Sequence, residues 1–160
     1  MLNIKLICVG KLKEKFYTDA SKEYIKRLGA YCGIEIDEIP EENRSGSRNE
    51  ADIETALKKE ASAIKNRIPK GAYVISMCIE GKKYDSEGFS RLISELAVSG
   101  ASRLCFIIGG SDGLHREIKD MSDLRISMSD MTFPHHLARI MLLEQIYRGF
   151  KISEGGKYHK

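Results

Sequence analysis

The feature that most constrains the fold is a pair of short runs that are almost entirely apolar, AYVISMCI at residues 72–79 and RLCFII at residues 103–108. Strands without polar alternation are typical of parallel sheets that helices cover on both faces. Three more runs of strand type lie at residues 2–9, 34–39 and 124–128, and helical patterns separate them. This alternation predicts a single-domain α/β fold, a mostly parallel sheet with helices on both faces.

The stretches between these strands carry apolar residues at helical spacing. Helices are predicted at residues 16–31, 51–68, 86–98 and 114–121, with a last helix that begins at Pro134. The polar stretch EENRSGSRN, residues 41–49, predicts a mobile loop. Because open parallel sheets bind ligands beyond the carboxyl ends of their strands, a site is expected at the turns after Ile79, Ile108 and Met128.

Charge and cysteine content set limits on function. The net charge of +3 is too small to indicate nucleic-acid binding without a local cluster. The four cysteines, at positions 8, 32, 78 and 105, form no C-x-x-C pair, so we expect small core thiols in a reducing cytosol and no metal site. No run approaches the length of a membrane span, and the early LICVG run lacks a signal-peptide cleavage pattern.

The last predicted helix lies in MTFPHHLARIMLLEQIYRGFKI, residues 131–152, and is apolar nearly all round. Such a helix is covered on two sides. The sheet is one cover, and a second copy of the chain is the expected other, with a core formed by one chain as the alternative. At its start, His135 and Arg139 share a face, and with Pro134 at the first helical position they suit an anion or a developing negative charge. The alternative is that Arg139 pairs with an acid and the histidines lie at the surface.

A glycine cluster, Gly109-Gly110-Ser111-Asp112-Gly113, follows the run at 103–108. Glycines there let the backbone approach a ligand, and Asp130 lies about twenty residues further on, where a Rossmann fold places its ribose-binding acid. The spacing is G-G-x-x-G rather than G-x-G-x-x-G, so a purely structural turn is an equal alternative. This cluster motivates a second hypothesis, a nucleotide- or NAD-binding oxidoreductase.

Two basic clusters suit RNA, because cations meet phosphates and aromatic rings stack on bases. One comprises Lys11, Lys13 and Lys15, and the other joins the C-terminal residues 155–160 to Arg148 and Lys151. A solvated basic surface is the alternative reading. These clusters motivate a third hypothesis, a non-catalytic ribosome-associated binding module.

Three segments together resemble one family. MLNIKLICVGKLKEKFY, FIIGGSDGLH and ISMSDMTFPHHLARIMLLEQIYRGFKI, with the terminal YHK, resemble the RlmH family of small bacterial SPOUT methyltransferases. The resemblance runs from the first strand to the last residue. It implies a homodimer, a C-terminal trefoil knot over about residues 103–160, a cytoplasmic location, and methyl transfer from S-adenosylmethionine to N3 of a pseudouridine in 23S rRNA of the assembled ribosome.

The resemblance also implies roles for individual residues. Cofactor contacts are expected at Met77, Gly109, Met128, Ser129, Asp130, Met131, Thr132 and Phe133. Catalytic roles are expected for His135, Arg139, Tyr158 and His159. Either His135 or His159 would accept the N3 proton, and Arg139 would stabilise charge on the uracil carbonyls or hold a phosphate. The tail is expected to cross to the partner's cofactor site.

Overall fold

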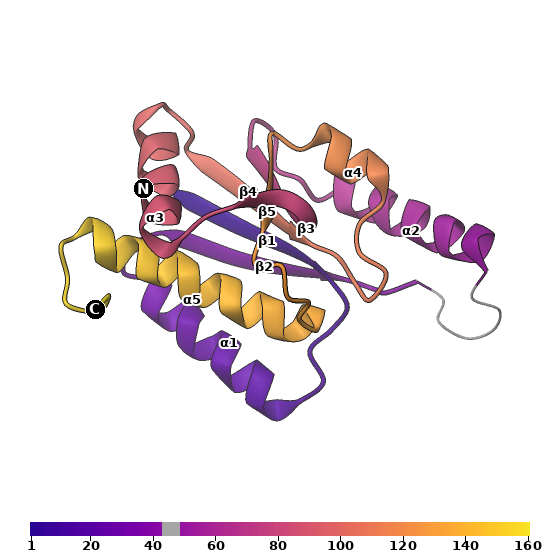
Figure 1. Ribbon diagram of the computed structural model, residues 1–160, viewed down its shortest axis with the longest axis horizontal. Coiled ribbons are helices and arrows are strands. Elements are labelled where there is room, and N and C mark those ends of the chain that lie inside the picture. The colour runs from indigo at the N-terminus through magenta and orange to yellow at the C-terminus, as the bar shows by residue number, and fades with distance from the viewer. Residues whose placement is uncertain (43–48) are drawn as a thin grey trace.

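The computed structural model describes residues 1–42 and 49–160. Most of the loop expected at residues 41–49 therefore lies outside the described residues. Strands and helices alternate along the chain (Figure 1). They are β1 (Asn3–Val9), α1 (Lys15–Leu28), β2 (Gly33–Ile39), α2 (Glu50–Lys65), β3 (Tyr73–Lys83), α3 (Ser86–Val98), β4 (Arg103–Ile108), α4 (Arg116–Met121), β5 (Leu124–Ser127) and α5 (His135–Ser153).

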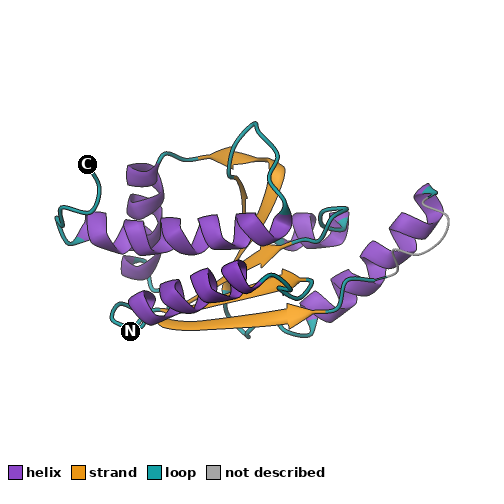
Figure 2. Ribbon diagram, turned by 90° about the horizontal axis from the view of Figure 1, so that it is seen from below, coloured by secondary structure: helices purple, strands orange, loops and turns teal. Residues whose placement is uncertain are grey.

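The five strands form a parallel sheet with the order β2-β1-β4-β3-β5. Helices α1, α3 and α5 pack on one face and α2 and α4 on the other, and α1 and α5 run side by side (Figure 2). The predicted α/β class, with helices on both faces, is confirmed.

Side-chain alternation along the central strands explains the apolar runs. Leu104 and Phe106 of β4 face the helix layer of α1, α3 and α5, whereas Cys105 and Ile107 face the layer of α2 and α4. All four side chains are fully buried. A strand covered on both faces has no position left for a polar side chain, which is why its sequence does not alternate.

The main error of the sequence prediction concerns the end of β3. The strand does not end at Ile79 but continues to Lys83, after a shift in its register with β5 between Met77 and Lys82. Gly81 permits this return, because a Cβ there would lie 2.5 Å from the backbone carbon of Ile126. The irregular stretch leaves Ile79 72% exposed. No turn follows Ile79, so the predicted ligand-binding position is an irregularity within the strand.

Helix boundaries differ by a few residues from the prediction. Helix α2 ends at Lys65 rather than at 68, and α4 begins at Arg116 because His115 caps it and accepts a hydrogen bond from the backbone of Glu117. Pro134 is the N-cap of α5 and not its first helical residue. Among the described helices, none is long and apolar enough to cross a membrane.

Candidate active site

Three chain segments enclose a cavity of about 600 Å³ at the carboxyl edge of the sheet. They are the irregular part of β3, the glycine turn after β4, and the segment that joins β5 to α5. Most residues expected to contact a cofactor line this cavity, namely Met77, Gly109, Met128, Ser129, Met131, Thr132 and Phe133. Asp130 does not line it; its side chain is 86% exposed and pairs with Lys83.

The glycine turn owes its shape to contacts within itself. A Cβ on Gly109 would lie 2.5 Å from the carbonyl oxygen of Gly113, and Gly113 has a φ of +79°. Gly110 and Gly113 also form an antiparallel bridge. The turn therefore needs glycines for its own closure as well as for an open approach from the cavity. It does not open a helix, as a dinucleotide-binding turn would, because α4 begins only at Arg116 and is short.

Hydrogen bonds to side chains fix the segment between β5 and α5. The hydroxyl of Ser127 donates to the Ser129 carbonyl at 3.1 Å, and the Met131 N–H donates to the Ser129 hydroxyl at 3.1 Å. The N-cap residue of α5, Pro134, provides no side-chain hydrogen bond to the first turn of the helix. The first turn of α5 therefore leaves backbone donors directed toward the end of the helix that adjoins the cavity.

His135 lines the cavity and lies close to a carboxylate that the sequence prediction missed. Its Nε2 is 3.7 Å from Oε2 of Glu41. The other carboxylate oxygen of Glu41 accepts from the N–H of Ser111 at 2.9 Å and from its hydroxyl at 2.5 Å. Glu41 thus connects the glycine turn to the start of α5. Its position in a polar, turn-like stretch gave no sign of this role.

Arg139 does not reach the cavity, although it shares a face of α5 with His135. Its side chain is 3% exposed, and it donates to Glu38 at 2.7 Å and to the carbonyl of Gly10 at 2.9 Å. Glu38 also accepts from the N–H of Leu12 at 3.1 Å. The guanidinium of Arg139 is therefore not free to bind an anion, contrary to the expectation from the sequence. The structure shows the alternative, in which Arg139 pairs with an acid. The reason is depth, since Arg139 lies one turn further along α5, beneath the ends of β1 and β2.

The two histidines at the helix start are neither free nor fully exposed. Their side chains are 22% and 18% exposed, and the rings of His135 and His136 lie 4.2 Å apart. His136 faces Glu14 at 3.8 Å and lies outside the cavity lining. Only His135 of this pair is placed to act on a ligand in the cavity.

The C-terminal tail packs against α5 of its own chain. Tyr158 donates to Glu144 at 2.8 Å, and Arg148 lies 3.3 Å from a ring nitrogen of His159. Burial, together with the hydrogen bond to Glu144, raises the pKa of Tyr158. Neither Tyr158 nor His159 lines the cavity that contains His135. A single chain therefore does not unite the residues expected to be catalytic.

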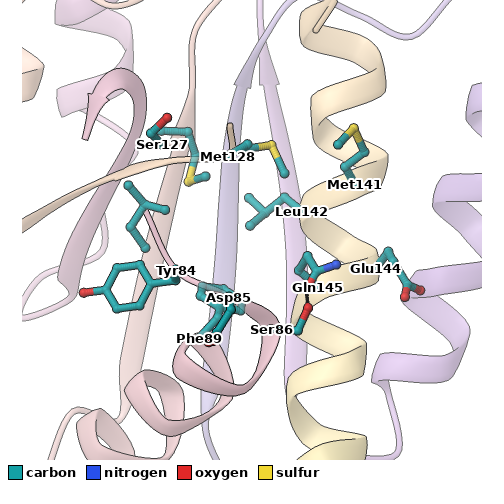
Figure 3. Close-up of a pocket in the computed structure, with 12 residues that line it drawn as sticks. Tyr84, Asp85, Ser86, Phe89, Ser127, Met128, Met141, Leu142, Glu144 and Gln145 are labelled. Carbon is teal, nitrogen blue, oxygen red and sulfur yellow. Dashed lines mark hydrogen bonds between the residues drawn. The ribbon is translucent and has the colours of Figure 1, made fainter. Parts of the chain in front are cut away.

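A second cavity, of about 420 Å³, adjoins the first and shares Met77, Ser127 and Met128 with it. Figure 3 shows it between α3 and α5, with Met141 and Gln145 on the α5 side. Ser86 donates to Gln145 at 2.8 Å, and both residues line this cavity. Met141, which lies outside the main apolar arc of α5, is only partly covered by this chain.

No ligand set for a metal is present within residues 1–42 and 49–160, where no three histidine, cysteine or acidic side chains come together. The four cysteines are unpaired thiols. Burial raises the pKa of Cys8 and of Cys105 to about 12 each, so both are neutral core side chains.

Comparison with known proteins extends over nearly the whole chain. The sequence model of a family described as predicted SPOUT methyltransferase matches residues 2–159. The ribosomal RNA large subunit methyltransferase H of Streptococcus uberis is 46% identical over 159 residues, which is 99% of this chain and 100% of that protein. Proteins of the same name from Streptococcus suis and Clostridium beijerinckii are 46% and 45% identical over the same shares.

Proposed function

Because the chain belongs to the SPOUT methyltransferase family and is an S-adenosylmethionine-dependent methyltransferase, we propose that its acceptor is N3 of a pseudouridine in 23S rRNA of the assembled ribosome. The family also implies a C-terminal trefoil knot, which we place at about residues 103–160. The names of the full-length relatives support the choice of ribosomal RNA. A protein that acts on ribosomes would work in the cytoplasm.

The observation that carries the proposal is the convergence of three segments on one cavity. Its volume of about 600 Å³ lies within the range of about 300–1,000 Å³ typical of small-molecule sites. In this proposal, backbone groups of lining residues such as Gly109, Met128 and Thr132 bind the polar edges of a nucleoside, and Met77, Ile108 and Phe133 offer apolar walls. These features fit S-adenosylmethionine, which supplies a methyl group on a positively charged sulfur.

The remaining chemistry falls to the protein. N3 of the acceptor base must lose its proton, and His135, in the wall of the cavity, is the histidine of this chain that can accept it. Walls that fix donor and acceptor in line supply much of the rate of such a displacement. Arg139, buried under the loop after β1, acts as a positioning residue and not on the base.

Tyr158 and His159 complete the site, in this proposal, from the second subunit of a homodimer. In their own chain they lie against Glu144 and Arg148, away from His135. The partly covered Met141 on α5 supports a partner on that side, as does the open cavity beside it. A dimer would bring each tail to the other subunit's cavity and explain why one chain separates the catalytic residues.

The test is to incubate the protein with S-adenosylmethionine labelled in the methyl group and with ribosomes that lack the modification. Label should be incorporated into 23S rRNA when the acceptor is the assembled ribosome, and should not be incorporated when the acceptor is protein-free rRNA. Calorimetry should show binding of S-adenosylmethionine but not of NADH. A folded sample that transfers no label, or that binds NADH instead, would contradict the proposal.

A further inference from the structure

The loop between β1 and α1 carries two exposed cationic side chains and begins at Gly10, where an added Cβ would lie 3.3 Å from Nε2 of His135 in the cavity wall. Lys11 and Lys13 are exposed, and no ion pair to either is present within the described part of the chain. Lys15, by contrast, pairs with Asp19 at 2.6 Å. Figure 1 shows this loop next to the start of α5. Two ammonium groups without acidic partners make a surface that attracts anions.

An exposed aromatic ring stands on the same segment. Phe16, in the first turn of α1, is 66% exposed, and the centroid of its ring lies 4.4 Å from that of Tyr17. The ring centroids of Tyr17 and His136 are 6.2 Å apart in an edge-on arrangement, and the ring of His136 lies next to that of His135 in the cavity wall. Successive ring contacts therefore lead from the protein surface to the cavity.

Two hydrogen bonds anchor the backbone of the loop. Arg139 donates to the carbonyl of Gly10 at 2.9 Å, and Glu38, its ion-pair partner, accepts from the N–H of Leu12 at 3.1 Å. Both anchors come from buried or half-buried side chains of other elements. A surface fixed before binding loses less conformational entropy when it meets its partner.

We propose that residues 11–16, which we call the basic loop, form a docking surface for an RNA strand beside the cavity. Lys11 and Lys13 contact phosphates, and an unpaired base stacks on the exposed face of Phe16. Every base has a face that can stack, so this contact positions a strand without reading its sequence. The inference rests on the proposed function for the choice of ribosomal RNA as the natural ligand.

The chemistry of the loop favours RNA over protein partners. A second copy of this chain would bury Phe16 without a need for two unpaired lysines. An acidic protein would use Lys11 and Lys13 but would gain nothing specific from an aromatic ring. Only a ligand with both phosphates and flat bases uses all three side chains, and the cavity next to them is the proposed site of base methylation.

The experiment measures binding of a fluorescent single-stranded RNA of about 20 nucleotides by anisotropy at several salt concentrations. The variants are K11Q/K13Q, Phe16→Leu, which keeps apolar area without a ring, and Phe16→Trp, which keeps a stacking face. The control K58Q/K59Q removes the same charge from two exposed lysines of α2. Calorimetry with S-adenosylmethionine and thermal unfolding accompany each variant.

We expect Phe16→Leu to weaken RNA binding at least about fivefold and Phe16→Trp to retain it. K11Q/K13Q should reduce the magnitude of the slope of log K for RNA association against log salt concentration by about 1.4, since two phosphate contacts are lost. K58Q/K59Q should leave this slope unchanged. Affinity for S-adenosylmethionine should stay constant, and the KM for unmodified ribosomes should rise in parallel with the loss of RNA binding.

Three results would overturn the inference. Equal effects of the two lysine pairs would show a response to net charge alone. Wild-type binding by Phe16→Leu would exclude stacking. A change of oligomeric state in sedimentation of Phe16→Leu would assign the ring to a contact between copies. Because RNA binding is measured without methyl transfer, these results are separate from a wild-type protein that fails to methylate ribosomes, which would count against the proposed function instead.

Discussion

Replacing Arg139 with alanine tests whether this residue supports the site or acts in it. The guanidinium is buried and makes two hydrogen bonds, one to Glu38 and one to the carbonyl of Gly10. Alanine would remove both and would leave an unfilled volume between α5 and the ends of β1 and β2. If Arg139 holds the loop after β1 in place, the first consequence should be a loss of folding stability.

The size of that loss follows from the two contacts. Breaking a buried ion pair costs about 3–5 kcal/mol, but Glu38 is 34% exposed and can be rehydrated, which lowers the cost. A buried carbonyl left without its donor costs about 1–3 kcal/mol. We therefore expect the free energy of unfolding to fall by about 2–4 kcal/mol, a large share of the roughly 5–15 kcal/mol of a typical domain. The melting temperature should fall by about 5–15 °C.

Urea denaturation followed by circular dichroism measures this difference. Arg27→Ala is the comparison variant, since Arg27 pairs with Glu23 on the exposed surface of α1 and lies over the rings of Tyr24 and Tyr147. Its free energy of unfolding should fall by less than that of Arg139→Ala, because solvent screens the exposed ion pair. A double-mutant cycle with Glu38→Gln then isolates the coupling between Arg139 and Glu38. A free energy of unfolding within about 1 kcal/mol of the wild type would be the effect of an ordinary surface substitution. If Arg139→Ala shows so small a change and yet transfers no methyl groups, the supporting role is refuted and a direct role on the base is favoured.

Three other predictions follow from the same structure. Gly109→Val should weaken binding of S-adenosylmethionine, measured by calorimetry, by more than about tenfold, because the valine side chain would strike the backbone of Gly113. The control Gly29→Ala, at a φ of −58°, should bind the methyl donor normally. Equal binding by both variants would show that the turn is only structural. Deleting residues 158–160 should preserve the melting temperature and cofactor affinity but abolish turnover, and an active truncated enzyme would remove the tail from the site. Burial raises the pKa of the Cys105 thiol from 9.0 to about 12 in the folded state. The unfolded chain therefore releases this proton at a lower pH than the folded protein does. The free energy of unfolding should fall as pH rises above about 9, by up to about 1.4 kcal/mol per pH unit for this group. Urea titrations at pH 8 and pH 10.5 should show a smaller fall for Cys105→Ala, and an unchanged fall would assign the effect to other groups.

The sequence predicted the elements of the fold well because burial on both sides leaves a strong local signal. The runs at residues 72–79 and 103–108 are apolar for a reason that does not depend on distant parts of the chain. The continuation of β3 to Lys83 was missed because its last residues are polar and pair with β5 only after a shift in register. That pairing depends on the close approach that Gly81 permits, which no local pattern reveals.

The candidate site was predictable to the extent that backbone topology determines it. Parallel strands end at one edge, so the residues after β4 and β5 had to lie near one another. The partners of side chains were not predictable in the same way. Glu41 and Arg139 each find their partners across long stretches of sequence, at Ser111 and Glu38 respectively. Sequence spacing placed Arg139 on the same face as His135 but gave no information about depth beneath the surface.

That difference in depth makes α5 a link between two binding surfaces. His135 stands at the first turn of α5, in the cavity wall, while Arg139, about one turn or 5.4 Å further along, fixes Gly10 at the base of the basic loop. Gly10 itself lies where a Cβ would come within 3.3 Å of Nε2 of His135, so loop and imidazole are in close contact. Displacing the loop through Arg139→Ala should therefore weaken binding of both RNA and S-adenosylmethionine, whereas K11Q/K13Q should weaken RNA binding alone. Should Arg139→Ala bind the methyl donor as tightly as the wild type, the loop and the cavity are independent and α5 does not connect them.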